Sequence, residues 1–70
     1  MKDTAKTPAE IIASYEPYNS FRTCKPYFDE GMAAYGRGIY QNPYEGPAGG
    51  VKAQAWDRGL EAASRIRRLS

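Results

Sequence analysis

Hydrophobic residues recur at helical spacing in three separate stretches of this chain. The first stretch follows the segment 7–10, Thr-Pro-Ala-Glu. Thr at the N-cap, Pro at the first helical position and Glu at the third form a capping box, because the Thr and Glu side chains each satisfy a free backbone donor. The pattern predicts a short helix over about 8–15, with Ile11 and Tyr15 on its apolar face. A helix this short is unstable alone in water, so that face must dock on the rest of the chain or on a partner.

The second stretch predicts a longer helix from Pro26 to about Gly38, where apolar residues fall three and four positions apart. Asp29 and Glu30 lie in the first turn of this expected helix, where negative charge is favourable for the helix dipole. Gly36 and Gly38 provide a stop, since glycine tolerates the left-handed dihedral angles of a helix C-terminus. The stretch therefore carries signals for both ends of a helix.

The third stretch predicts the longest helix, from about Val51 to Arg68, with arginines crowded in its last turns, where positive charge suits the dipole. Ahead of it, residues 40–50 are rich in Gly, Pro and Asn, which break both helix and strand. Apolar residues alternate nowhere over a strand-length run, so no sheet is expected. The expected fold class is therefore all-α, with an N-terminal arm over 1–26 that carries the short helix and a helical hairpin over 27–70.

The two longer helices carry a similar phrase, Phe-Asp-Glu-Gly-Met-Ala-Ala at 28–34 and Trp-Asp-Arg-Gly-Leu-Glu-Ala at 56–62. Glycine inside a helix costs roughly 1 kcal/mol against alanine, so one in each helix indicates that the two backbones need close approach there. We expect an antiparallel hairpin with Gly31 and Gly59 near the crossing. The residues expected to pack beside the crossing are Phe28, Ala34, Trp56 and Ala62. The alternative is chance similarity in a short chain rich in Ala and Gly.

Length and composition limit the chain to one small domain. It has 70 residues, of which 41% are hydrophobic, and a domain of this size is marginally stable, so a homodimer or another partner could supply missing burial. Cys24 is the one cysteine and histidine is absent, which excludes an internal disulfide and a structural zinc site. Cys24 is expected to be a free thiol in a reducing compartment. Because the sequence carries neither a membrane-spanning stretch nor a signal peptide, a cytoplasmic location is expected.

Over about residues 27–65 the sequence resembles the ribosome modulation factor family of small bacterial proteins. The residues that carry the resemblance are Gly31 and Ala34, then Asn42, Pro43 and Tyr44 in the connection, then Trp56, Gly59 and Ala62. The chain departs from the family at Leu60, where a second tryptophan is common, and in a longer spacing after Tyr44. The resemblance implies two helices joined by a structured connection. It also implies binding to the small ribosomal subunit, near the end of its rRNA where messenger RNA is selected, and promotion of inactive ribosome dimers during slow growth.

The function expected from the resemblance is translation regulation by occupancy of small-subunit rRNA. Net charge is only +2, but the last helix is locally basic and could attract phosphate. The residues expected to contact RNA are Arg37, Tyr40, Tyr44, Lys52, Arg58, Arg65, Arg67 and Arg68. Tyrosines in a stiff connection could stack on unpaired bases. Two alternatives stay open: the arginines form a solvated helix end that compensates the dipole, and Tyr44 folds back to anchor the connection.

A second hypothesis is a protein–protein inhibitor or adaptor, of a kind that a phage could encode against a host complex. Aromatic residues are enriched at interface hot spots, and four of them gather in and beside the arm: Tyr15, Tyr18, Phe21 and Tyr27. A structural subunit that folds only as an oligomer is a third hypothesis. An enzyme is not expected, because the chain has no histidine, no nucleophile–base arrangement and no phosphate-binding loop. Neither a cofactor nor a metal is expected.

Overall fold

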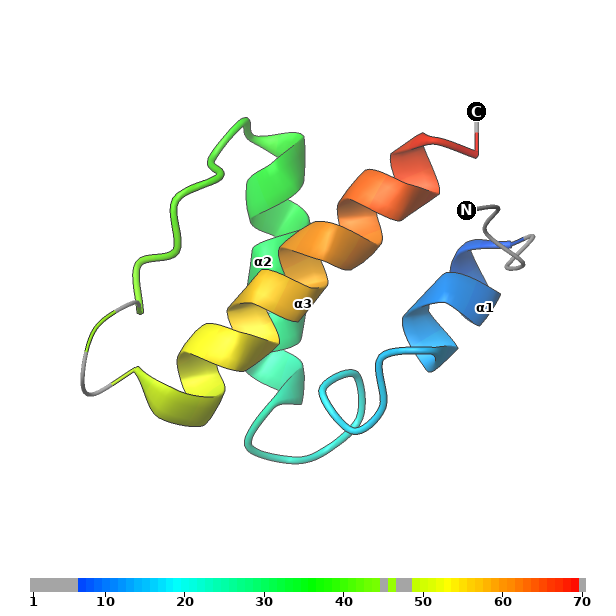
Figure 1. Cartoon of the computed structure of the whole chain (residues 1–70). Helices are drawn as coiled ribbons and strands as arrows, with labels where there is room; N and C mark the ends of the chain where they lie inside the picture. Colours follow the sequence, from blue (N-terminus) through cyan, green and yellow to red (C-terminus); the bar gives the residue numbers. More distant parts are fainter. Residues whose placement is uncertain (1–6, 45, 47–48, 70) are drawn as a thin grey trace.

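Three helices and no strands make up the part of the chain that the structure describes. A computed structural model describes residues 7–44, 46 and 49–69. Figure 1 shows the helices in chain order: α1 (Pro8–Ala13), α2 (Lys25–Gly36) and α3 (Gly50–Arg67). The two longer helices cross, and α1 packs beside α3. The prediction of an all-α fold with a short extra helix in the N-terminal arm is confirmed. The first six residues of that arm lie outside the described residues.

The capping box at the start of α1 is present as predicted. The Thr7 hydroxyl accepts from the Glu10 backbone N–H at 3.2 Å, and the Glu10 carboxylate accepts from the Thr7 N–H at 3.0 Å. The helix ends at Ala13, two residues before the predicted end. The Ser14 N–H is shared between the Glu10 and Ile11 carbonyls, and the Tyr15 N–H donates to the carbonyl three residues before it, so the chain leaves the α-helical pattern here. Ile11 is fully buried, so this short helix docks on its own chain.

Helix α2 begins at Lys25, slightly ahead of the predicted start at Pro26. The expectation that Asp29 and Glu30 lie in the first turn is therefore wrong, because the earlier start moves both into the second turn. Asp29 instead pairs with the Lys25 ammonium one turn earlier, at 3.0 Å. Both side chains are more than half exposed, so this pair contributes little to stability.

Gly38 ends α2 in the way that the sequence predicts. Its φ is 76°, in the left-handed region where glycine is favoured. The Gly38 N–H donates to the Tyr35 carbonyl at 3.1 Å, and the Ile39 N–H donates to the Ala34 carbonyl at 2.9 Å. These two bonds form a Schellman motif, which satisfies carbonyls that the helix end would otherwise leave free.

Helices α2 and α3 meet backbone to backbone at two glycines. A Cβ atom on Gly31 would overlap the Trp56 carbonyl oxygen, and a Cβ atom on Gly59 would overlap the Phe28 carbonyl oxygen. The contacts are reciprocal, since each glycine faces the aromatic residue that starts the phrase on the other helix. The repeated phrase in the sequence therefore marks a close helix crossing.

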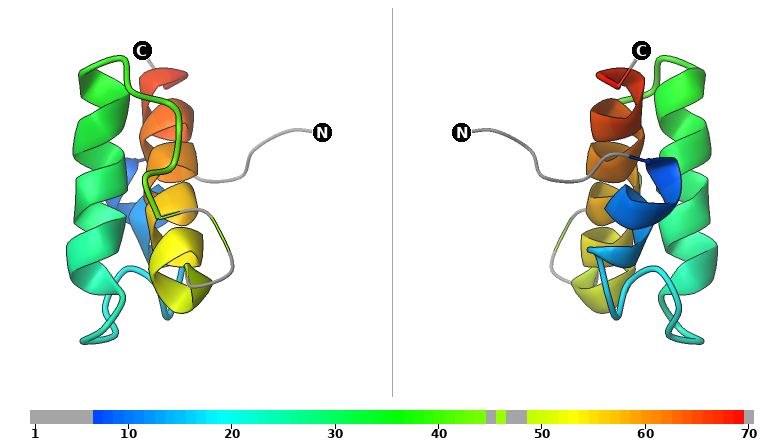
Figure 2. Two further views of the ribbon diagram at one scale, coloured as in Figure 1. Left: turned by 90° about the vertical axis from the view of Figure 1, so that its left-hand side faces the viewer. Right: turned by 90° about the vertical axis from the view of Figure 1, so that its right-hand side faces the viewer.

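The expected antiparallel hairpin is wrong, because α2 and α3 run in the same direction (Figures 1 and 2). Near their first residues the Lys52 ammonium lies 5.5 Å from the centre of the Tyr27 ring, and near their last residues Gly36 and Arg67 line one groove. The described part of the connection, within 37–49, returns along the helix pair. A segment of that length reaches roughly 40 Å when extended, whereas the 12 residues of α2 span about 18 Å, so the return is easily made.

The core lies where the three helices meet. Trp56, Phe28 and Ile11 are its largest fully buried side chains. Tyr15, just after α1, packs on Phe28 with ring centroids 5.9 Å apart. The small residues expected beside the crossing, Ala34 and Ala62, are also buried. Pro43, by contrast, is exposed in the connection.

Asn42 fastens the connection to α3. Its side-chain amide donates to the Ala53 carbonyl at 2.8 Å and to the Asp57 carboxylate at 2.9 Å. Its side-chain oxygen accepts from the Tyr44 N–H at 2.9 Å. Only 7% of Asn42 is exposed, and hydrogen bonds shielded from water are stronger. One buried polar side chain thus holds the connection against the helix pair.

Replacing this residue, Asn42→Ala, should lower the free energy of unfolding by about 1–3 kcal/mol, because the Tyr44 N–H loses its partner in a partly buried setting. Urea unfolding followed by circular dichroism measures the loss. The exposed neighbour supplies a matched control: Gln41→Ala should change stability by less than about 0.5 kcal/mol. Equal effects of the two substitutions would show that Asn42 does not fasten the connection.

Candidate nucleic-acid interface

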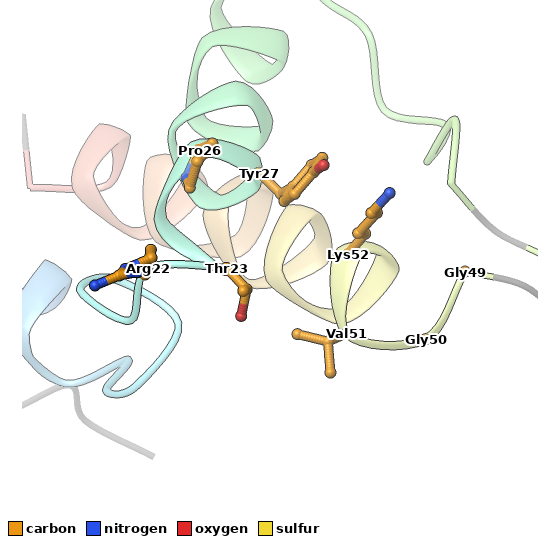
Figure 3. Close-up of a pocket in the computed structure, with 8 residues that line it drawn as sticks. All are labelled: Arg22, Thr23, Pro26, Tyr27, Gly49, Gly50, Val51 and Lys52. Atoms are coloured by element: carbon orange, nitrogen blue, oxygen red, sulfur yellow. The ribbon is translucent and has the colours of Figure 1, made fainter.

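Because α2 and α3 run in the same direction, both helices begin at one end of the molecule and both end at the other. We call the end where they begin the N-terminal pole and the end where they finish the C-terminal pole. A pocket of about 470 Å³ lies at the N-terminal pole, between the start of α3 and the segment leading into α2 (Figure 3). This basic pocket is lined by Arg22, Thr23, Pro26, Tyr27, Gly49, Gly50, Val51 and Lys52.

Among the described residues that line the basic pocket, two carry positive charge and none carries a carboxylate. Arg22 and Lys52 lie on opposite sides of it (Figure 3), and the Tyr27 ring lies on the Lys52 side, with its centre 5.5 Å from the Lys52 ammonium. Pro26 and Val51 add apolar surface. Neither α2 nor α3 has an acidic residue in its first turn or a side-chain N-cap, so the positive ends of both helix dipoles add to the potential of this pole. The pocket thus combines cationic sides with an apolar and aromatic floor.

Tyr27 joins the basic pocket to the connection. Its ring meets the ring of Tyr44 edge-on, with centroids 5.1 Å apart and planes at 84°. The Tyr44 hydroxyl donates to the two oxygens of the Glu30 carboxylate at 2.8 and 3.0 Å, and this hydrogen bond is the main cause of a raised pKa for Tyr44. Tyr44 therefore folds back to anchor the connection, which is one of the two alternatives that the sequence left open. Its anchoring leaves Tyr27 as the aromatic ring of the pocket.

The other residues expected to contact RNA do not gather on one surface. Arg37, Arg67 and Arg68 are exposed at the C-terminal pole, where α2 and α3 end, whereas Lys52 lies near the start of α3. Tyr40 is 63% exposed on the connection, where its ring leans on Tyr35 with centroids 5.5 Å apart. The basic residues of the chain thus occupy both poles, and the basic pocket lies at the pole where the helices begin.

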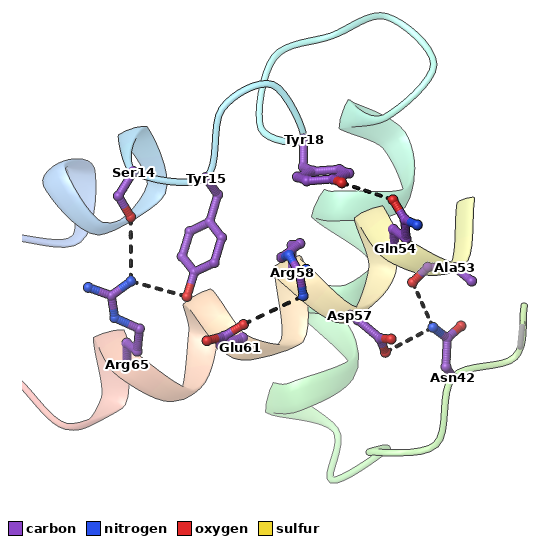
Figure 4. Close-up of polar contacts among 10 residues, drawn as sticks. All are labelled: Ser14, Tyr15, Tyr18, Asn42, Ala53, Gln54, Asp57, Arg58, Glu61 and Arg65. Carbon is purple, nitrogen blue, oxygen red and sulfur yellow. Dashed lines mark hydrogen bonds and ion pairs between the residues drawn. The ribbon is translucent and has the colours of Figure 1, made fainter. Parts of the chain in front are cut away.

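Arg58 and Arg65 face the N-terminal arm (Figure 4). The Arg58 guanidinium lies 5.7 Å from the centre of the Tyr18 ring, and 4.0 Å from the Glu61 carboxylate. Arg65 donates to the Tyr15 hydroxyl at 3.1 Å, and its guanidinium lies 5.5 Å from the centre of the same ring. Both arginines, expected on the sequence to contact RNA, therefore hold the arm against α3.

The arm aromatics expected to bind a partner are mostly used within the chain. Tyr15 is buried in the core, and the Tyr18 hydroxyl donates to the Gln54 side chain at 2.9 Å (Figure 4). Tyr27 lines the basic pocket. Phe21 differs from these three, since 59% of it is exposed. The four aromatics therefore do not form one free surface.

Sequence reasoning identified Lys52 but missed Arg22, Pro26 and Val51 as its neighbours. Arg22 and Pro26, in and just before the first turn of α2, are far in the chain from Val51 and Lys52 at the start of α3. The two segments meet because α2 and α3 run in the same direction. Arg22 lies in an irregular segment that carries no motif, so no pattern in the sequence singles it out. An antiparallel arrangement would have separated the residues of this pocket.

Three further observations concern the described residues. Cys24, at the N-cap of α2, is a buried free thiol and does not line the basic pocket. Across the described ranges, histidine, cysteine and acidic side chains nowhere gather as they would around a metal ion. Among the helices of the described part, none is both long enough and apolar enough to cross a membrane.

Comparison with known protein families, with curated proteins and with solved structures found no match to this chain. The likeness to the ribosome modulation factor family thus depends on the residues quoted for it alone. The structure places those residues in two regions. Gly31, Gly59, Trp56 and Ala62 lie at or beside the helix crossing, and Asn42 and Tyr44 hold the connection.

Proposed function

We propose that this protein binds unpaired RNA in the basic pocket and regulates translation by occupying rRNA of the small ribosomal subunit. The observation that carries the proposal is a pocket whose described lining has two cations, an aromatic ring and no carboxylate. Phosphates are attracted by Arg and Lys, and unpaired bases stack on aromatic rings. This combination fits a nucleotide better than it fits an uncharged or cationic ligand.

A base in the pocket would lie against Tyr27 and Val51, while its flanking phosphates reach Arg22 on one side and Lys52 on the other. Stacking contributes about 1–3 kcal/mol for each base. An unpaired strand is the favoured ligand, because taking a base out of a duplex costs a few kcal/mol of unstacking and unpairing energy. Binding alone suffices for such a role, since a protein that covers a segment of rRNA denies that segment to messenger RNA.

The small ribosomal subunit is proposed as the target because of the resemblance in Gly31, Asn42 to Tyr44, Trp56 and Gly59. The basic pocket supports the RNA half of the proposal, and the resemblance supports the ribosomal half. A net charge of +2 implies that binding depends on the few local cations. Two phosphate contacts, to Arg22 and Lys52, correspond to a slope of about −1.4 in log K against log salt for a single strand, so binding weakens only modestly as salt rises. The pocket has a volume of about 470 Å³, so the protein would act at a short exposed segment.

Reversing charge in the pocket should weaken RNA binding. Arg22→Glu and Lys52→Glu are each expected to lower the affinity for a fluorescein-labelled single-stranded RNA by about ten-fold, because a phosphate contact is replaced by repulsion. Tyr27→Ala should cost about 1–3 kcal/mol of binding free energy and leave the salt dependence unchanged. Fluorescence anisotropy, repeated over a range of salt concentrations, measures both quantities.

Arg37→Glu is the matched control, since it makes the same charge change at the C-terminal pole. It should lower the affinity by less than about three-fold, through the net charge alone. An effect as large as that of Arg22→Glu would contradict a site localised at the N-terminal pole. Co-sedimentation with purified small subunits at low salt tests the ribosomal half, and its absence would remove the ribosome as the target.

The adaptor hypothesis stands as the second candidate because Phe21 is 59% exposed, and an exposed aromatic residue is a typical interface anchor. A pull-down from cell lysate with and without nuclease separates the two proposals. Association that nuclease abolishes supports RNA binding. Association that survives nuclease and is lost in Phe21→Ala supports a protein partner.

A further inference from the structure

Glu30 carries a carboxylate close to the basic pocket, although it does not line the pocket. It follows Tyr27 by three positions on α2, so the two side chains share one face of the helix. The Tyr27 ring lines the pocket, and its centre lies 5.5 Å from the Lys52 ammonium. An ion pair between Glu30 and Lys52 would occupy a cation that the pocket otherwise offers to a phosphate.

Glu30 is bound to Tyr44 instead. The Tyr44 hydroxyl donates to both oxygens of the Glu30 carboxylate, at 2.8 and 3.0 Å. A hydrogen bond to a charged acceptor is stronger than one between neutral groups. Within the described part of the chain, Lys52 forms no ion pair. The carboxylate is thus held by a neutral donor, and the ammonium keeps its charge available.

Three further contacts fix Tyr44 beside the pocket. Its backbone N–H donates to the Asn42 side-chain oxygen at 2.9 Å. Its ring meets the Tyr27 ring edge-on, with centroids 5.1 Å apart. Its carbonyl oxygen lies so close to Gly49 that a Cβ atom on that glycine would overlap it. Since Tyr27 and Gly49 both line the pocket, the position of Tyr44 is tied to the pocket at its ring and at its backbone.

Two neighbouring carboxylates have partners that do not involve the pocket. Asp29, the other acidic residue of α2, pairs with the Lys25 ammonium at 3.0 Å. Asp57 of α3 accepts from the Asn42 side-chain amide at 2.9 Å. Of these three carboxylates, Glu30 is therefore the one whose partner affects the charge of the pocket.

From these contacts we infer that Tyr44 is a positioning residue of the basic pocket, whose hydroxyl holds the Glu30 carboxylate away from Lys52 and so keeps that ammonium free for an anion. The inference rests on the proposed function in taking this anion to be a phosphate of RNA. Without the hydroxyl, Glu30 loses its partner and turns toward Lys52, whose long and flexible side chain can meet it. The resulting ion pair then competes with the phosphate.

Tyr44→Phe isolates the hydroxyl, because it keeps the ring on Tyr27 and the backbone contacts. The lost hydrogen bond is exposed to solvent, so the variant should fold as wild type does. Its affinity for a fluorescein-labelled single-stranded RNA should fall by about three- to five-fold. This loss is smaller than the ten-fold loss expected for Lys52→Glu, since the cation is neutralised by an internal partner and not replaced by a negative charge.

Removing the carboxylate as well should restore binding. Glu30→Gln alone should bind RNA as tightly as wild type or up to about three-fold more tightly, because a negative charge near the pocket is gone. Tyr44→Phe/Glu30→Gln should match Glu30→Gln within about two-fold, since the hydroxyl matters only while residue 30 is charged. Tyr35→Phe, the same chemical change near the end of α2, is the control and should alter affinity by less than about two-fold.

The side chain of Lys52 reports on the same event without RNA. Nuclear magnetic resonance of isotope-labelled protein follows its ammonium and the methylene group beside it. These resonances should move in Tyr44→Phe, because Lys52 then has a carboxylate as a neighbour. They should return to near their wild-type positions in Tyr44→Phe/Glu30→Gln, which lacks the hydroxyl but also lacks that carboxylate.

An affinity that falls equally in Tyr44→Phe and in the double variant would show that Tyr44 acts through structure alone, and would overturn the inference. An unchanged affinity in Tyr44→Phe would overturn it too. A wild-type chain that binds no RNA would instead remove the proposed function, and the Lys52 resonances then decide the inference. Resonances that move in Tyr44→Phe and return with Glu30→Gln support it, and resonances that stay in place or do not return overturn it.

Discussion

Gly59→Ala is expected to lower the free energy of unfolding by about 3 kcal/mol, the upper end of the cost of overpacking. The added methyl group would overlap the Phe28 carbonyl oxygen and lie 3.1 Å from the Met32 backbone nitrogen. These are backbone atoms of α2, so they cannot turn aside as a flexible side chain can, and the helices must separate instead. The gain of about 1 kcal/mol in helix propensity offsets only part of this cost.

Thermal unfolding followed by circular dichroism measures the effect of the glycine substitutions. Gly36→Ala is the matched control, because Gly36 is also helical and a Cβ atom there meets nothing within 4 Å. That variant should be as stable as wild type or more stable by up to about 1 kcal/mol. A Gly59→Ala variant that unfolds no earlier than Gly36→Ala would contradict backbone contact at the crossing.

Phe28→Ala should cost about 3–5 kcal/mol, because it removes a large buried side chain and leaves a cavity. Phe28 is 1% exposed and joins the two parts of the molecule: it belongs to α2, and its ring contacts Tyr15 of the arm. A domain of this length has a total stability of roughly 4–10 kcal/mol. The variant should therefore lose about a third or more of its stability, and at the lower end of this range much of it would be unfolded at room temperature.

Urea unfolding compares this variant with Phe21→Ala, which makes the same chemical change at a side chain that is 59% exposed. Phe21→Ala should change stability by less than about 0.5 kcal/mol. Similar losses in the two variants would show that Phe28 is not the centre of the core. A loss confined to Phe28→Ala would agree with a core centred on Phe28.

The features that sequence predicted well depend on residues close together in the chain. The capping box needs Thr7 and Glu10, and the stop after α2 needs the left-handed residue Gly38. Both are satisfied by local hydrogen bonds, so the pattern determines them wherever the helix packs. The crossing at Gly31 and Gly59 was also predicted, because a repeated glycine inside two helices has few explanations other than close approach.

The direction of the helices could not be read from the sequence in the same way. A glycine crossing is compatible with helices that run in the same direction or in opposite directions, since either brings Gly31 and Gly59 together. The choice depends on the path of the connection, which the hydrogen bonds of Asn42 to Ala53 and Asp57 hold against α3. No local pattern in the sequence predicts that long-range contact. The assumption of a simple hairpin therefore gave the wrong direction of α3 relative to α2.

That error carried over to the candidate site. Basic residues were assigned to RNA by their position near the end of the last helix, which the structure places at the pole opposite Lys52. Arg58 and Arg65 were assigned for the same reason, and their neighbours are tyrosines of the arm. The chemistry expected of the residues was reasonable, but their grouping in space depends on helix direction. Arg22 and Tyr27 join Lys52 only in the arrangement that the structure shows.

In the proposed mode of binding, the N-terminal pole, created by two helices running in one direction, holds the RNA. Titration of isotope-labelled protein with a short single-stranded RNA, followed by nuclear magnetic resonance, tests it most directly. Resonance shifts should concentrate at Arg22, Tyr27 and residues 49–52, and they should fade as salt is raised. Shifts that instead concentrate at Arg37, Arg67 and Arg68, with the pocket residues unmoved, would contradict the account.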